Sequence, residues 1–263
     1  MSINNTFSWN RFLLLCRQYQ IHNGKFLMYA IVGYCGVVFI ILSLGQLGND
    51  AEAFGINVFL QLLLTFGAIF GVLYTGYSFS PFRAKESTIS YLTMPASALE
   101  KFLFELVSRI GLALFLLPFF YWLTFNLQGL FFELVSEADF DPIWFSTFAE
   151  MDISPIDESF WLPVVIIFSS LLVFVLPFTG AAIFSKQPLI KTLFSVAIIM
   201  TSFGSVIYVV MEPLGLSNYT PNDSLFLLPN KEEAAVRFAA LTLILINVVM
   251  LFTAYLKIKE KEV

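Results

Sequence analysis

Two ionisable residues, Glu105 and Arg109, lie near the start of an apolar run that extends from Phe104 to Asn126. Ionisable side chains inside such a run are the usual indicators of a proton relay, an ion path or a catalytic group. A spacing of four residues places both side chains on one face of a helix, where a carboxylate and a guanidinium pair with each other. The spacing therefore predicts a salt bridge within one helix.

Other groups that could do chemistry are scarce. The only histidine, His22, precedes the first long apolar run, and we interpret it as a solvated residue. The sequence contains no HExxH zinc motif, no GxSxG nucleophile motif and no paired carboxylates within the apolar runs. It also lacks the GxxxxGK[ST] loop that binds nucleotide phosphates. We therefore expect a protein that is not an enzyme and holds no metal or cofactor, and whose energy, if it does energised work, comes from another chain.

The composition predicts an all-α integral membrane protein. Of the 263 residues, 58% are hydrophobic and only 13% are charged, and the mean hydropathy is +0.82. Charged residues make up about a quarter of a soluble domain. A helix of about 20 residues crosses the hydrocarbon core, whereas a spanning barrel would show short alternating segments. Six apolar runs reach the helical length: 27–47, 56–78, 104–126, 161–184, 190–211 and 236–256.

The distribution of charge predicts the orientation of a single membrane domain that covers residues 1–263. Twelve of the fourteen Lys and Arg residues fall on one side of a six-span topology, and Lys231 and Arg237 are the exceptions. By the positive-inside rule that side is the cytoplasm, so both termini are expected to be cytoplasmic. The net charge of −5 and the lack of a basic patch do not suggest a nucleic-acid partner.

The segment before the first span has the pattern of an amphipathic helix. Residues 8–22 place apolar side chains at helical spacing, which predicts a helix in the cytoplasmic interface.

Residues 127–160 form an acidic external loop, and we expect part of it to fold back onto the membrane surface as short helices. Its carboxylates lack the spacing of a calcium loop, so cation binding stays undecided. Gly67 and Gly71 have the small-xxx-small spacing of a close helix contact, which also arises by chance.

The loop between the second and third spans has the strongest local signals. Pro95 moves Met94 out of the helical region, so a short helix over 85–93 must end there. Ser97 and Glu100 have the spacing of a capping box, which starts a helix that continues into the third span. The sequence therefore predicts a short helix, a proline break and a firmly capped long helix. Such an elbow could transmit force from a cytosolic partner, or it could merely position the third span.

The run from Phe82 to Leu103, with the core LTMPASALEKFL, resembles the cytoplasmic loop of bacterial type-2 ATP-binding-cassette (ABC) permeases, where an LPxSxxEKFL-like segment lies between spans two and three. Met94 stands where a leucine is more usual. The segment FSKQPLIKT, residues 184–192, is similar to the short basic loop between spans four and five of the same family. The six-span layout with an interfacial N-terminal helix also fits that family.

The resemblance implies a permease subunit in a bacterial cytoplasmic (inner) membrane that pairs with a second permease subunit, in a homodimer or heterodimer, and with a separate ATPase subunit. Its short helix would dock on the ATPase, and its substrate is not indicated. The residues expected to couple the two subunits are Arg83, Lys85, Glu86, Tyr91, Met94, Pro95, Ser97, Glu100 and Lys101. The alternative is a membrane scaffold or sensor subunit that transports nothing and uses the same elbow to hold a partner.

Overall fold

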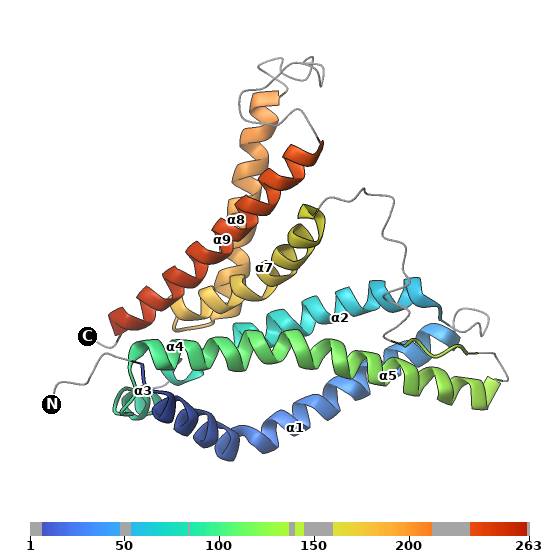
Figure 1. Cartoon of the computed structure of the whole chain (residues 1–263), viewed down its shortest axis with the longest axis horizontal. Coiled ribbons are helices and arrows are strands. Elements are labelled where there is room, and N and C mark those ends of the chain that lie inside the picture. The colour runs from blue at the N-terminus through green and yellow to red at the C-terminus, as the bar shows by residue number, and fades with distance from the viewer. Residues whose placement is uncertain are drawn as a thin grey trace. The chain divides into compact units, whose positions relative to one another are not determined.

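A computed structural model describes residues 7–47, 54–83, 85–136, 140–144, 160–211 and 232–261. Most of the predicted acidic external loop lies outside these residues, as does the side chain of His22. The residues that are described contain helices, turns and short irregular segments but no strand (Figure 1).

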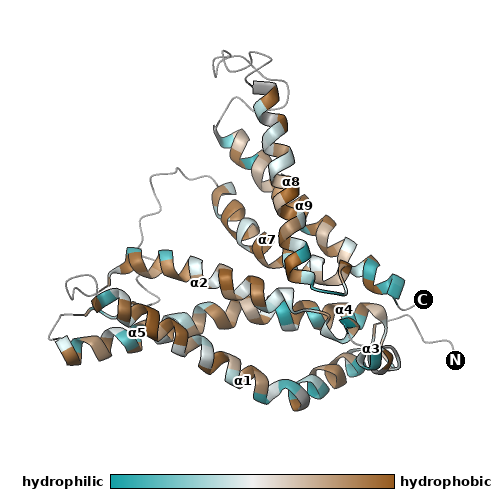
Figure 2. Ribbon diagram, turned by 180° about the vertical axis from the view of Figure 1, so that it is seen from behind, coloured by the Kyte–Doolittle hydropathy of each residue, from teal (hydrophilic) through white to brown (hydrophobic). Residues whose placement is uncertain are grey.

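Six of the helices are long and apolar enough to cross a membrane, which confirms the predicted fold class at this level. Apolar residues cover most of their surfaces, as expected of helices that face lipid (Figure 2). The helices that contain these candidate spans are α1 (Trp9–Leu47), α2 (Ile56–Gly76), α4 (Ala98–Leu106) continuing into α5 (Leu112–Ser136), α7 (Trp161–Ile183), α8 (Pro188–Met211) and α9 (Glu232–Lys261).

Two helices are longer than the spans that the sequence predicts within them. The third span is predicted to end at Asn126, and α5 continues to Ser136 because residues 127–136 contain no proline and are mostly apolar. The interfacial helix over 8–22 and the first span are a single helix, α1, since Asn23 and Gly24 weaken a helix without ending it. The first ten residues of the predicted external loop, 127–136, are therefore helical, and where the spans themselves end stays a prediction.

The described chain divides into two compact units, and whether they form one membrane domain stays a prediction. Unit 1 comprises residues 1–74 and 94–153, and unit 2 comprises residues 75–93 and 154–263. In unit 1, α1 packs against α5 and α4. The core of this unit is aromatic and includes the side chains of Tyr34, Phe59, Phe66, Tyr121 and Phe125.

A short segment without regular secondary structure, residues 140–144, packs on α5 within unit 1. The Trp122 indole donates to the carbonyl oxygen of Ile143 at 2.6 Å, and the Asn126 amide both donates to that oxygen and accepts from the Ile143 N–H. The ring of Phe140 lies directly against Gly129, where a Cβ atom would leave no room for it. The described part of the loop therefore packs on α5 and forms no helix, and the expected fold-back of the loop onto the membrane surface stays a prediction.

Unit 2 is built around α7, which packs along α9 and also contacts α8. Gly180 of α7 lies against the side chain of Thr192 in α8, so closely that an added Cβ would overlap the threonine. Of the pair Gly67 and Gly71, whose spacing could arise by chance, Gly67 has no close neighbour, since a Cβ there would meet nothing within 4 Å. Close approach therefore uses a single glycine opposite a threonine, a pattern that spacing between glycines does not reveal.

Candidate coupling segment

The residues expected to couple the chain to a partner fall into both compact units. Residues 75–93 belong to unit 2 and include a 3₁₀ turn, η1 (Ser80–Arg83), and the short helix α3 (Lys85–Leu92). Residues from Met94 onward belong to unit 1 and include α4.

Arg83 bonds to the residues at the C-terminal end of α2. Its Nη2 donates to the carbonyl oxygens of Gly76 at 3.0 Å and Ser78 at 3.3 Å, and its guanidinium lies 4.3 Å from the centre of the Tyr77 ring. Carbonyl groups at the C-terminal end of a helix lack intrahelical partners, and a cation there also interacts favourably with the helix dipole. Arg83 therefore closes the end of α2.

The turn after α2 contains a strained residue. Phe79 has a φ of 53°, a region that a bulky side chain rarely adopts. Its ring is buried, with its centre 4.9 Å from that of Phe178 in α7. This packing holds the turn in place and thereby directs the chain into η1 and α3.

Helix α3 has one attached face and one exposed face. The hydroxyls of Ser87 and Thr88 donate to the carbonyl oxygen of Pro81 at 2.8 and 2.9 Å. The buried ring of Tyr91 meets the ring of Phe82 edge-on, with 5.2 Å between the centres. The side chains on the exposed face are those of Lys85, Glu86 and Ile89. The short helix therefore presents two charges and an aliphatic side chain to its surroundings.

The proline break is present where the sequence predicts it. Helix α3 ends at Leu92, Met94 is half-buried and Pro95 is exposed. The Ala96 N–H donates to the Met94 carbonyl oxygen at 2.8 Å, which makes a tight turn around the proline. Helix α4 then begins at Ala98.

The predicted capping box is confirmed. The Ser97 hydroxyl accepts from the Glu100 N–H at 3.3 Å, and Glu100 Oε2 accepts from the Ser97 N–H at 2.8 Å. Two backbone donors at the start of α4 are thereby satisfied by the reciprocal pair. Both side chains are buried.

Glu100 has a second role that the sequence did not reveal. Its Oε1 accepts from the backbone N–H of Ser8 at 2.6 Å, and it pairs with the Arg11 guanidinium at 3.0 Å from Nη2 and 3.2 Å from Nε. The carboxylate therefore joins the start of α1 to the start of α4. Since Glu100 is fully buried and the neighbouring Lys101 nearly so, neither side chain offers a docking surface.

The predicted salt bridge between Glu105 and Arg109 is also confirmed, with 3.4 Å between Oε2 and Nε. Both residues are buried, and the Arg109 guanidinium lies 5.0 Å from the centre of the Tyr74 ring and 5.8 Å from that of Tyr19. Cations near aromatic faces gain electrostatic stabilisation. The pair is thus enclosed between α1, α2 and α4, which agrees with a structural role.

Arg109 lies in a π-helical stretch, η2 (Val107–Gly111), that interrupts the helix from α4 to α5. A π turn changes the i to i−4 bonding and weakens the pairing of nearby carbonyls. The Tyr74 hydroxyl donates to the Ser108 carbonyl oxygen at 2.9 Å, and so binds the interrupted stretch to α2. Nothing in the sequence pattern indicated this interruption.

Among the described residues, no group of three or more His, Cys, Asp or Glu side chains could hold a metal ion. Comparison with other proteins adds no family: no family model matches the chain, and neither a curated protein nor a solved structure matches it significantly.

Proposed function

We propose that this chain is the membrane-spanning permease subunit of an ABC exporter, driven by ATP that a separate subunit hydrolyses. In this proposal α3 docks on the ATPase at the cytoplasmic face of a bacterial inner membrane, and two permease subunits enclose the substrate path. The type-2 permease assignment rests on the resemblance of LTMPASALEKFL to the loop of that family.

The observation that carries the proposal is the exposed face of α3. Lys85, Glu86 and Ile89 share this face, while the opposite face is fastened to η1. A short helix that is held firmly on one side and exposes charged and aliphatic groups on the other can bind a partner and move with it, so that movement of the partner displaces the attached chain. The long helix that starts three residues after Pro95 continues through α5, so a displacement of the elbow can reach the far end of a membrane helix.

The second candidate function, a scaffold or sensor subunit, uses the same exposed face but requires no transport. Both functions require a bound cytosolic partner. They differ in whether partner binding is linked to ATP hydrolysis and to movement of a substrate.

The proposal is tested by expressing the chain with an ABC ATPase from the same genome, chosen from a neighbouring gene where there is one, and measuring ATP hydrolysis of the purified pair in nanodiscs. We expect stimulated hydrolysis with the wild-type chain. Lys85→Glu reverses a charge on the exposed face of α3 and should weaken both assembly and stimulation. Lys259→Glu is the matched control, because Lys259 is an exposed lysine near the end of α9.

Equal effects of the two substitutions would reject α3 as the docking element. An ATPase that binds through α3 but whose hydrolysis is unchanged would favour the scaffold function. A chain that neither binds nor stimulates an ABC ATPase would reject the permease proposal itself.

A further inference from the structure

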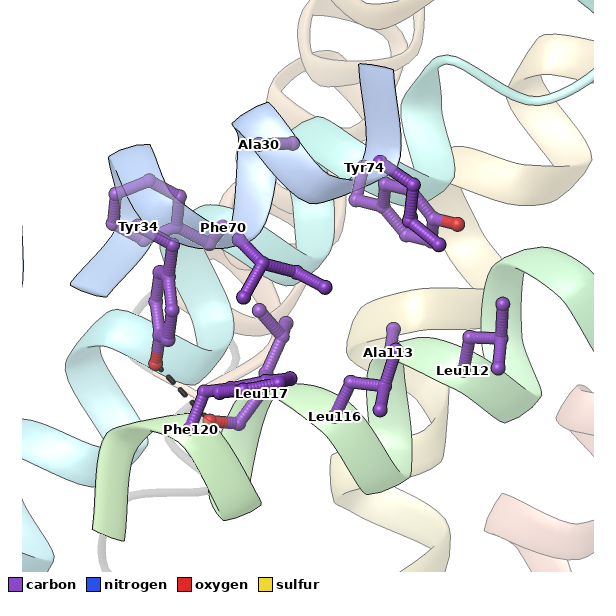
Figure 3. Close-up of a pocket in the computed structure, with 11 residues that line it drawn as sticks. Ala30, Tyr34, Phe70, Tyr74, Leu112, Ala113, Leu116, Leu117 and Phe120 are labelled. Carbon is purple, nitrogen blue, oxygen red and sulfur yellow. Dashed lines mark hydrogen bonds between the residues drawn. The ribbon is translucent and has the colours of Figure 1, made fainter. Parts of the chain in front are cut away.

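A cavity of about 110 Å³ lies within unit 1, between α1, α2 and the first half of α5. Figure 3 shows Tyr34, Phe70 and Tyr74 facing a row of α5 side chains that includes Ala113 and Leu117. All of these residues lie in helices that are long and apolar enough to cross a membrane. The cavity is partly open, so a molecule can enter it.

The wall offers almost nothing to a polar ligand. Its two hydroxyl groups already donate to backbone carbonyls, Tyr34 to Leu117 at 3.2 Å and Tyr74 to Ser108 at 2.9 Å. The other lining side chains are aliphatic or phenylalanine. A buried water needs two to four polar partners, and apolar cavities without them stay dry. The lining of the cavity therefore favours a hydrocarbon ligand over a polar one.

The shape of the cavity comes from two small side chains. Ala30 on α1 and Ala113 on α5 both line it, and a larger residue at either position would occupy the space. An apolar cavity of about 150 Å³ can hold a benzene molecule, so a cavity of this size takes roughly the last four carbons of a chain. A headgroup would have to stay outside.

We propose that this cavity binds the end of one acyl chain of a membrane phospholipid. The bilayer supplies such chains beside the spanning helices, and a dry void between them would forfeit dispersion contacts along its whole wall. A bound chain would lie against Tyr74, the residue that holds the π-helical stretch through Ser108. Occupancy of the cavity would therefore support the interrupted part of the helix from α4 to α5. This inference does not depend on the proposed permease function.

The test uses phosphatidylcholine with a diazirine at the end of one acyl chain, incorporated into nanodiscs with the full chain. After irradiation, mass spectrometry locates the labelled residues. We expect labelling of the lining residues Leu112, Leu116 and Leu117, in addition to general labelling of exposed side chains such as that of Phe115 and those of α8. Ala113→Phe fills the cavity and should abolish most labelling of these three lining residues while leaving Phe115 and α8 labelled as before.

Ala113 is buried, so Ala30→Phe serves as a second variant at the exposed edge of the cavity and should give the same loss. Ala239→Phe adds the same bulk to an exposed position on α9 and should leave the labelling unchanged. Persistent labelling of Leu112, Leu116 and Leu117 in both cavity variants would overturn the proposal. So would labelling by a diazirine-tagged dodecyl maltoside but not by the phospholipid, because that result would assign the cavity to free amphiphiles.

Discussion

Replacing Glu100 by alanine should cost the protein more stability than the loss of any other single charged side chain in the described elbow. The substitution removes a buried carboxylate that accepts from two backbone N–H groups, of Ser97 and Ser8, and from the Arg11 guanidinium. Hydrogen bonds to a charged group contribute about 1.5–3 kcal/mol each, and breaking a buried ion pair costs about 3–5 kcal/mol. The Arg11 side chain is 27% exposed, so water replaces part of the loss. We therefore expect the free energy of unfolding to fall by about 3 kcal/mol, at the lower end of the range.

The assay is equilibrium unfolding in mixed micelles with increasing SDS, followed by far-UV circular dichroism. Arg11→Ala should cost less, about 1 kcal/mol, because the carboxylate keeps its two backbone donors. A double-mutant cycle on Arg11 and Glu100 isolates their interaction, which we expect to be about 1 kcal/mol. The matched control is the ion pair between Lys257 and Glu260, whose nitrogen and oxygen lie 2.6 Å apart. Its side chains are 42% and 62% exposed, so breaking it should cost about 0.5 kcal/mol or less.

Two results would refute this reasoning. If Glu100→Ala cost no more than Glu260→Ala, the fully buried carboxylate would not stabilise the start of α4. If the losses in the double-mutant cycle were additive, α1 and α4 would not be joined through Arg11 and Glu100.

The same unfolding assay checks three other positions. Gly180→Ala should destabilise by about 1–3 kcal/mol because the new Cβ overlaps Thr192, whereas Gly204→Ala, where nothing lies within 4 Å, should be neutral or stabilising; equal effects would contradict the close contact. Gln128→Leu removes the buried amide donor to Gln46 and should cost about 1–2 kcal/mol, and a smaller loss would mean that the amides are satisfied elsewhere. Tyr74→Phe removes the hydroxyl bound to the π-helical stretch and should cost about 1 kcal/mol and speed amide hydrogen exchange in that stretch; unchanged exchange would show that the hydroxyl does not hold it.

Features that depend on residues close together in the chain were predictable from the sequence. Hydropathy and length identify the six long helices. The capping box needs only Ser97, Glu100 and a proline that ends the preceding helix, and the salt bridge needs only the spacing between Glu105 and Arg109. In each case the interaction lies within one helix or at one helix end, so local geometry determines it.

Features that depend on distant segments were not predictable in this way. Arg11 and Glu100 are 89 positions apart, and nothing in either local pattern indicates the other. The contact of Gly180 with Thr192 depends on which faces of α7 and α8 meet, so the spacing between glycines does not reveal it. The extension of α5 to Ser136 could have been anticipated from the absence of a helix breaker. The π-helical stretch had no such signal.

The charged residues between α2 and α4 differ in whether they bond within the protein or face outward, and this difference decides which of them could contact a partner. A basic or acidic residue beside a break in the chain suggests partner binding, yet Arg83 closes α2 and Glu100 fastens α4 to α1. The charges that remain exposed, Lys85 and Glu86, are both on α3. In the proposed function, partner binding through the charges of the elbow would therefore use the short helix, while Glu100, after Pro95, holds α4 within its own unit. Substitutions on α3 should alter partner binding without loss of stability, and substitutions at Glu100 should alter stability first.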